Sequence, residues 1–224
     1  MFERAIELDP EYAEAYAALG WTHFDAWTMQ WSQDPQTLGR AFQLAQKARG
    51  LYDSLAGCRV LLAHVYLWKK QHERAIAEAE RAIALEPNNA DNQMDLAQIL
   101  TWAGRPEEAI RLVEKAMRLN PRYPFYYLWT LGHAYWLTGR HEEAIRALKR
   151  VLTRNPDWLP AHAHLAVIYS ELGRKQDARA EMAELQRLSP EASLERVKER
   201  LPYKDQAVLE RFLEGFRKAG WEQG

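Results

Sequence analysis

Residues 105–123 have the sequence RPEEAIRLVEKAMRLNPRY, and residues 140–158 have the sequence RHEEAIRALKRVLTRNPDW. Two further segments align with them, QHERAIAEAERAIALEPNN at residues 71–89 and RKQDARAEMAELQRLSPEA at residues 174–192. The first alanine and the closing proline of each segment recur at spacings of 34, 35 and 34 residues. Self-similarity at a fixed period of this length indicates a repeat architecture.

Each repeat carries small and helix-breaking residues at fixed places. Gly104, Gly139 and Gly173 come directly before three of the segments, where a turn needs a backbone conformation that costs other residues energy. The closing proline cannot continue a helix and restricts the residue before it, so it ends the second helix. The alanines let two helices cross closely. These features predict a helix–turn–helix unit.

The first helix of each unit carries its own pattern, a leucine followed by a small residue and then a larger apolar residue three positions on. It occurs as Leu62-Ala63 with Tyr66, Leu96-Ala97 with Leu100, Leu131-Gly132 with Tyr135, and Leu165-Ala166 with Tyr169. With the closing proline and the period of about 34 residues, this pattern resembles the tetratricopeptide repeat. The resemblance implies an all-α fold: a right-handed α-solenoid of a half repeat and about five full repeats, with a C-terminal helical cap.

The repeat pattern predicts the boundaries along the chain. Residues 1–12 match the second helix of an incomplete repeat, so Met1 is interpreted as a boundary within a longer protein. Five repeats follow in residues 13–190, the first of them lengthened by a loop at 25–37. This loop brings Trp27 and Trp31, which are expected to cover the end of the core because aromatic burial is the common outcome.

Residues 191–224 are predicted to form the helical cap. Ser193 and Asp205 are expected to cap two helices, Pro202 separates the helices, and Gly220 ends the second one.

Composition and charge exclude several classes of partner. The chain has 30 Lys and Arg against 31 Asp and Glu, whereas nucleic-acid binding needs a basic excess. No apolar run reaches the roughly 20 residues needed to cross a bilayer, and the N-terminus does not resemble a signal peptide. Cys58 is the single cysteine, so no internal disulfide forms, and we expect a cytoplasmic protein with no nucleic-acid and no membrane partner.

The sequence offers no constellation for catalysis. The seven histidines are scattered and form no HExxH or His/Cys cluster, so no metal site is predicted. Cys58 lies in an apolar segment and is expected to be a buried thiol. Phosphate-binding and serine-nucleophile motifs are absent. We therefore expect neither an enzyme nor a cofactor.

The first helices are expected to line a concave groove that binds a protein or peptide ligand. The predicted groove residues are Trp21, His64, Trp68, Met94, Gln98, Trp102, Trp129, His133, Trp136 and His164. This set has no Lys or Arg, which argues against a carboxylate clamp, and it suits an apolar or amphipathic peptide or helix. Trp68, Trp102 and Trp136, spaced 34 residues apart, suggest an exposed ladder; the alternative is that several of these side chains pack on neighbouring helices.

The segment from Ser193, SLERVKERLPYKDQAVLERFLEGFRKAGWEQG, resembles the tail that closes the repeat region of bacterial class III adenylate/guanylate cyclase-like signalling proteins. The resemblance implies a regulatory or interaction region whose ligand is another protein or its own parent chain. Two alternatives stay open: a self-assembly module forming a homo-oligomer, which the half repeat suggests, and a small-molecule-responsive regulatory domain with the aromatic groove as its pocket.

Overall fold

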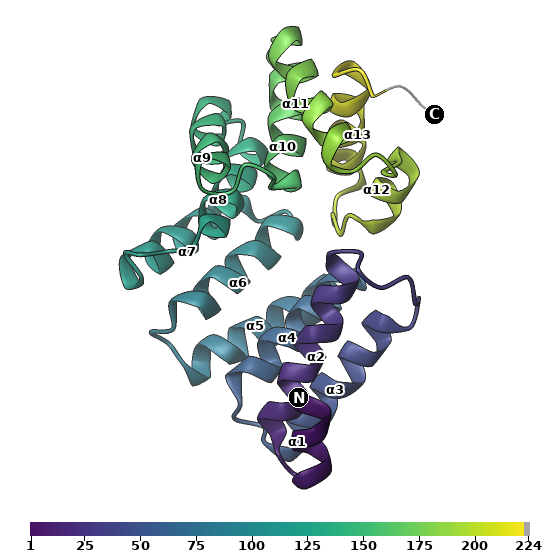
Figure 1. Cartoon of the computed structure of the whole chain (residues 1–224). Helices are drawn as coiled ribbons and strands as arrows, with labels where there is room; N and C mark the ends of the chain where they lie inside the picture. The colour runs from purple at the N-terminus through teal and green to yellow at the C-terminus, as the bar shows by residue number, and fades with distance from the viewer. Residues whose placement is uncertain (222–224) are drawn as a thin grey trace. The chain divides into compact units, whose positions relative to one another are not determined.

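The computed structural model describes residues 1–221, and this part of the chain folds into helices joined by short turns (Figure 1). The helices are α1 (Phe2–Leu8), α2 (Ala13–Thr28), α3 (Thr37–Leu51), α4 (Ala56–Trp68), α5 (His72–Leu85), α6 (Ala90–Trp102), α7 (Pro106–Leu119), α8 (Phe125–Leu137), α9 (His141–Arg154), α10 (Leu159–Glu171), α11 (Lys175–Leu188), α12 (Leu194–Arg200) and α13 (Gln206–Lys218). None of these helices is long and apolar enough to cross a membrane.

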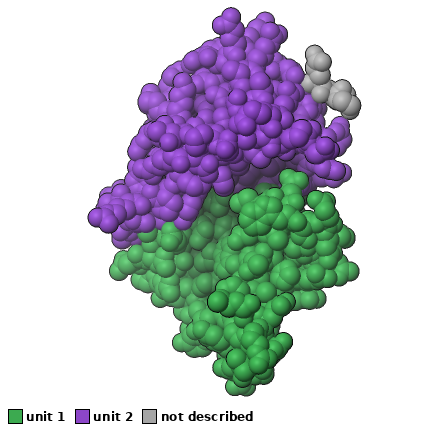
Figure 2. Space-filling view, in the orientation of Figure 1, with its two compact units in different colours: residues 1–99 green, residues 100–224 purple. Residues whose placement is uncertain are grey.

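The chain divides into two compact units, residues 1–99 and residues 100–224, coloured separately in Figure 2. Unit 1 contains α1 to α5 and most of α6, and unit 2 contains the end of α6 and the helices after it.

Each unit is built from helix pairs that follow one another in the chain. The two helices pack together in α2–α3, α4–α5, α8–α9 and α10–α11. Small residues allow the close approach, since a Cβ on Gly132 would lie 2.8 Å from Cγ of Leu148 in the partner helix. The first helix of a pair also packs on the second helix of the pair before it, as α4 does on α3 and α10 on α9. This packing confirms the predicted all-α solenoid of tetratricopeptide-type repeats.

The turn inside each pair has a residue with positive φ. Gly104, Gly139 and Gly173 have φ values of 80°, 75° and 70°, as their place before the second helix predicts. In the pair α4–α5 this place is taken by Lys70, with φ of 57°. A side chain in this conformation costs roughly 1–2 kcal/mol, so Lys70 is a strained point of unit 1.

The first full repeat departs from this pattern between its two helices. α2 continues to Thr28, and residues 29–36 form the connection to α3. Trp27 is half-buried and packs edge-on against Trp68, with 5.4 Å between ring centroids. Trp31, in contrast, is 76% exposed. The expectation that both indoles cover the core is therefore wrong for Trp31.

Several first helices are tied to the turn before them by a side chain that reaches back six residues. Arg59 donates to the carbonyl of Asp53, and Gln93 donates to the carbonyl of Pro87. His162 makes the same contact with Pro156 at 2.8 Å. These bonds satisfy turn carbonyls that would otherwise lack partners.

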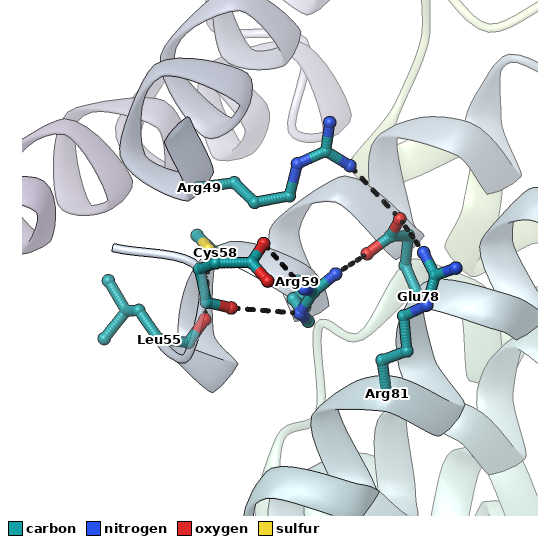
Figure 3. A network of polar contacts seen from close by, with 7 residues as sticks. Arg49, Leu55, Cys58, Arg59, Glu78 and Arg81 are labelled. Atoms are coloured by element: carbon teal, nitrogen blue, oxygen red, sulfur yellow. Dashed lines mark hydrogen bonds and ion pairs between the residues drawn. The ribbon is translucent and has the colours of Figure 1, made fainter. Parts of the chain in front are cut away.

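Unit 1 also contains a buried ion-pair network between α3, α4 and α5 (Figure 3). The carboxylate of Glu78 accepts hydrogen bonds from Arg59 at 2.8 Å, from Arg81 at 2.9 Å and from Arg49 at 3.3 Å. Cys58, next to Arg59, is fully buried, as predicted for a structural thiol. The network leaves no buried charge unpaired, which is the condition for tolerating such a group in a core.

Candidate peptide-binding faces

The ten predicted groove residues divide equally between the units. Those of unit 1 lie on the first helices α2, α4 and α6, and with Asp25 and Asp95 we call them the unit 1 face: Trp21, Asp25, His64, Trp68, Met94, Asp95 and Gln98. Those of unit 2 lie at the end of α6 and on α8 and α10, and with Glu171 we call them the unit 2 face: Trp102, Trp129, His133, Trp136, His164 and Glu171.

His64 lies at the centre of the unit 1 face. Its Nε2 is 2.8 Å from Oδ1 of Asp95 on the next first helix. Trp21 and Phe24, on the preceding first helix, meet the imidazole ring at centroid distances of 5.6 Å and 5.7 Å. Three consecutive first helices are thereby joined through one buried side chain.

Part of the unit 1 face remains accessible. Trp21, Trp68 and Gln98 are half-buried, whereas His64 and Met94 are buried. The accessible side chains combine two indoles with an amide, the composition expected of a surface that binds apolar side chains and peptide groups.

The unit 1 face is acidic. Within α2 and α6 the charged residues are all carboxylates, Glu14 and Asp25 in the first and Asp91 and Asp95 in the second. The one basic residue of α4, Arg59, is bound to Asp53 and Glu78. Burial raises the pKa of Asp25, and the nearby His64 partly offsets the rise. A carboxylate with a raised pKa is one that gains from a cationic neighbour.

The unit 2 face is closed, in contrast to the predicted open groove. All five predicted residues of unit 2, Trp102, Trp129, His133, Trp136 and His164, are buried. The exposed ladder of Trp68, Trp102 and Trp136 is therefore wrong, and the alternative of aromatic packing holds for these two indoles of unit 2.

The register explains why Trp136 does not continue such a ladder. Trp68 and Trp102 lie two residues before the positive-φ residue of their turns, whereas Trp136 lies three residues before Gly139. The extra residue of this repeat is in the connection 120–124, which is one residue longer than the connections 86–89 and 155–158. Trp136 is therefore turned by about 100° around its helix, given 3.6 residues per turn.

The C-terminal segment, residues 193–221, covers the unit 2 face. The Tyr203 hydroxyl lies 2.9 Å from Nε2 of His133, and the Tyr203 ring packs edge-on against Trp102 with centroids 4.5 Å apart. Phe212 of α13 packs against both Trp136 and His164, at centroid distances of 5.6 Å and 5.0 Å.

Polar contacts add to this aromatic packing. Arg211 donates two hydrogen bonds to the carboxylate of Glu171, at 2.7 Å and 2.8 Å, and lies over the ring of Trp136. Ser170 donates to the carbonyl of Gly215, and the backbone N–H of Lys204 donates to the carbonyl of Trp102. Paired donation from Arg to a carboxylate is the strongest of these contacts.

Burial beneath the segment shifts the pKa values of its partners. Desolvation lowers the pKa of His164 to about 4 and the pKa of His133 well below its ordinary value, and the mutual proximity of the two rings lowers the latter further. Desolvation also raises the pKa of Tyr203 well above its usual range. The covered face is therefore uncharged at neutral pH apart from the pair of Arg211 with Glu171.

The helices of the C-terminal segment form as predicted, and the longer one, α13, packs on the last repeat. Ser193 and Asp205 cap α12 and α13 through their side chains, and Gly220 has a φ of 96°. However, α13 packs on α10, the first helix of the last pair, whereas α4, α8 and α10 pack mainly on the second helix before them. The local pattern gives the helices and their caps, and it does not give the surface they cover.

Tyr203, Arg211 and Phe212 are the functional residues that the sequence patterns miss. The apolar spacing of residues 206–218 identifies an amphipathic helix, but the partner residues His133, Trp136 and Glu171 are 40 or more positions away. One signal is present in the sequence: α8 and α10 contain Glu171 as their single Asp, Glu, Lys or Arg, which makes it the one carboxylate of these helices with which a basic side chain of the segment can pair.

Three family models, each describing a tetratricopeptide repeat, match residues 56–89, 86–157 and 135–201 and together cover residues 56–201. The chain belongs to the tetratricopeptide repeat family. The family models thus identify tetratricopeptide repeats over more than half of the sequence of this protein. A comparison with curated protein sequences finds no match.

Solved tetratricopeptide structures have the same fold. PilW, a widely conserved type IV pilus biogenesis factor, is 18% identical with a TM-score of 0.69, over 92% of this chain and 88% of PilW. TTC0263, a thermophilic TPR protein in Thermus thermophilus, is 20% identical with a TM-score of 0.66, over 92% of this chain and 99% of TTC0263. YrrB, a TPR protein with an unusual peptide-binding site, is 21% identical with a TM-score of 0.52, over 85% of this chain and 93% of YrrB. At these identities the likeness shows the fold alone.

Proposed function

We propose that this tetratricopeptide protein is a protein-interaction module whose unit 1 face binds a peptide or helix that carries basic residues. The observation that carries the proposal is the combination of accessible indoles with carboxylates on α2, α4 and α6, where Arg59, the one Lys or Arg of these helices, is bound elsewhere. Tetratricopeptide repeats in general mediate protein–protein interaction, and one structural relative is described as having an unusual peptide-binding site.

Four accessible residues of the unit 1 face have separate roles in this proposal. Trp21 offers an apolar surface, and aromatic anchors of this kind dominate the affinity of many interfaces. Gln98 offers both a donor and an acceptor for a peptide group. Asp25 and Asp95 attract the basic side chain, which steers association and selects against acidic peptides.

A regulatory role within a longer signalling protein is a further part of the proposal. It is supported by the resemblance of the C-terminal segment to the tail of cyclase-like proteins. The ligand of the unit 1 face is then either a separate protein or another part of the parent chain.

The test is a selection of peptides from a random library on the full chain, followed by fluorescence-anisotropy titration of the selected peptides. Selected peptides are expected to combine Lys or Arg with an apolar residue. Asp25→Lys is expected to weaken binding by about tenfold or more, as removal of a complementary charge at an interface does. Asp177→Lys is the matched control, because this exposed carboxylate lies on α11 in unit 2, where it pairs with Arg174. Selected peptides without basic residues, or equal loss with both variants, would contradict the proposal.

A further inference from the structure

The unit 2 face already holds a polypeptide segment. Residues 203–216 of the chain place an aromatic hydroxyl on His133, an arginine on Glu171 and a phenylalanine between Trp136 and His164. These contacts come from a turn followed by an amphipathic helix, which is the form in which many peptides bind helical grooves.

The segment does not continue the repeat. Three first helices that follow a pair pack mainly on the second helix before them, α4 on α3, α8 on α7 and α10 on α9. α13 instead packs on α10, beside which it is drawn in Figure 1. Its position is that of a ligand laid across the first helices of unit 2, and a five-residue connection, 189–193, precedes α12.

Charge complementarity identifies the chemistry of this occupant. α8 and α10 contribute one charged side chain of the Asp, Glu, Lys and Arg types, the carboxylate of Glu171. Arg211 satisfies it with two hydrogen bonds while its guanidinium lies 4.7 Å from the centroid of the Trp136 ring. Arginine combines bidentate pairing with stacking on an aromatic ring, and lysine cannot do both.

The fit also requires a small residue on the bound helix. A Cβ on Gly215 would lie 2.8 Å from Cγ1 of Val167, and the Gly215 carbonyl accepts a hydrogen bond from Ser170. The occupant therefore has an arginine, an aromatic residue one position later and a glycine four positions after the arginine, as in Arg211-Phe212-Leu213-Glu214-Gly215.

We propose that the unit 2 face is a second binding site, specific for a partner's amphipathic helix with this arginine–aromatic–glycine pattern, and that the chain's own C-terminal segment holds the site closed until such a helix displaces it. The proposal goes beyond binding at the unit 1 face and extends it to a partner of stated chemistry. A tethered segment competes at an effective concentration in the millimolar range, so the closed form dominates until a strong or abundant partner is present.

The test uses the full chain and a fluorescein-labelled peptide with the sequence of residues 200–221, RLPYKDQAVLERFLEGFRKAGW. In the Arg211→Glu chain the tethered segment is repelled by Glu171, and the face itself is unchanged. Anisotropy titration is expected to show binding at least about tenfold tighter than to the wild-type chain, because the tethered segment loses its bidentate pair and competes less well.

Charge exchange supplies the specificity control. The Glu171→Arg chain is expected to reject the native peptide and to bind a peptide carrying Arg211→Glu. The double variant Glu171→Arg, Arg211→Glu restores the pair within the chain and is expected to bind the labelled native peptide no better than the wild type.

A second variant keeps every contact and weakens only the tether. A 40-residue Gly/Ser insertion after Glu191 lengthens the connection before α12 and lowers the effective concentration of the segment, which is expected to strengthen peptide binding by about tenfold through loop-closure entropy. Absence of peptide binding to both opened chains, with their helical circular dichroism retained, would overturn the proposal. A wild-type dimer with exchanged C-terminal segments in sedimentation analysis would also overturn it, because a second copy would then be the occupant. Either result leaves peptide binding at the unit 1 face intact and separately measurable.

Discussion

The hydroxyl of Tyr203 lies 2.9 Å from Nε2 of His133, and the two buried residues are 70 positions apart in the chain. The contact joins the turn before α13 to the middle of α8. Because both groups are removed from water, each depends on the other for its hydrogen bond.

Replacing Tyr203 by Phe is expected to destabilise the docked C-terminal segment. The change removes one oxygen and leaves Nε2 of His133 buried without that partner, at a cost of about 1–3 kcal/mol. Urea unfolding followed by circular dichroism measures the loss. Tyr52→Phe is the control, because Tyr52 is 54% exposed, and equal effects of the two changes would contradict the assigned role of the Tyr203 hydroxyl.

Acidification is expected to weaken unit 2. The folded-state pKa of His164 is about 4 against an ordinary value of 6.5, and the pKa of His133 is also lowered. Between these values the unfolded chain binds more protons, so stability is full above pH 6.5 and falls as the pH drops toward 4. For His164 alone the loss at pH 5 is about 2 kcal/mol.

The variant His164→Leu tests the source of this pH dependence. It is expected to flatten the fall in unfolding free energy between pH 7 and pH 5 measured by urea titrations. Leu131→Ala shortens a buried apolar side chain of α8 and is expected to lower stability at every pH with the slope unchanged. A slope that survives in His164→Leu would assign the effect to other groups.

The contribution of His162 to stability depends on pH in the opposite direction to that of His164. Its two ring nitrogens meet two acceptors, Glu181 at 2.6 Å and the carbonyl of Pro156, and the hydrogen bond with Glu181 is the main cause of its raised pKa. Its contribution is complete below pH 6.5 and is lost as the pH rises through the folded-state pKa. With His133 and His164, this predicts a stability maximum near neutral pH, which the same titrations extended to pH 8 would reveal. In Glu181→Gln the decline on the alkaline side is expected to shrink.

The network around Glu78 in unit 1 predicts an asymmetry between its members. Glu78→Ala removes the shared acceptor of three arginines and leaves Arg59, whose side chain is 10% exposed, with Asp53 as its remaining carboxylate partner, so we expect a loss of about 3 kcal/mol. Arg81→Ala removes an arginine that is 60% exposed and is expected to cost less than about 1 kcal/mol. Thermal unfolding of the two variants compares their losses of stability directly. Similar losses would contradict the assignment of Glu78 and Arg59 as the buried part of the network.

Lys70 is the position at which a glycine is expected to improve the protein. Its φ of 57° matches the glycines of the other turns, and relieving that strain outweighs the entropy cost of glycine, for a gain of about 0.5–1 kcal/mol. Lys69→Gly is the matched control, because φ at Lys69 is −84°. A higher urea midpoint is expected for Lys70→Gly only, and destabilisation by both would refute the argument.

The repeat itself could be predicted because its determinants are local. The closing proline and the turn glycine each determine the backbone within a few residues, and their recurrence gives the period. The caps Ser193 and Asp205 are local in the same way. Lys70 shows the limit of the turn pattern, since a non-glycine residue takes the same conformation there.

The candidate sites could be predicted only in part. The first-helix residues were identifiable by register, but their exposure depends on a segment whose contacts are remote in sequence. Trp136 is buried because Phe212 covers it, and one extra residue in 120–124 gives it a position on its helix that differs from that of Trp102. No local sequence pattern predicts the packing of α13 on α10 or the ion pair of Arg211 with Glu171.

The central claim is that the C-terminal segment is a detachable occupant of the unit 2 face and not part of its core. Amide hydrogen exchange of the wild-type chain, resolved by mass spectrometry of proteolytic fragments, tests it most directly. Elements that open separately exchange with different free energies, so we predict that α13 exchanges at least about tenfold faster than α10 and does so without exchange in α8. Exchange of α13 and α10 in one step, at the same rate and with the same dependence on urea, would contradict the account.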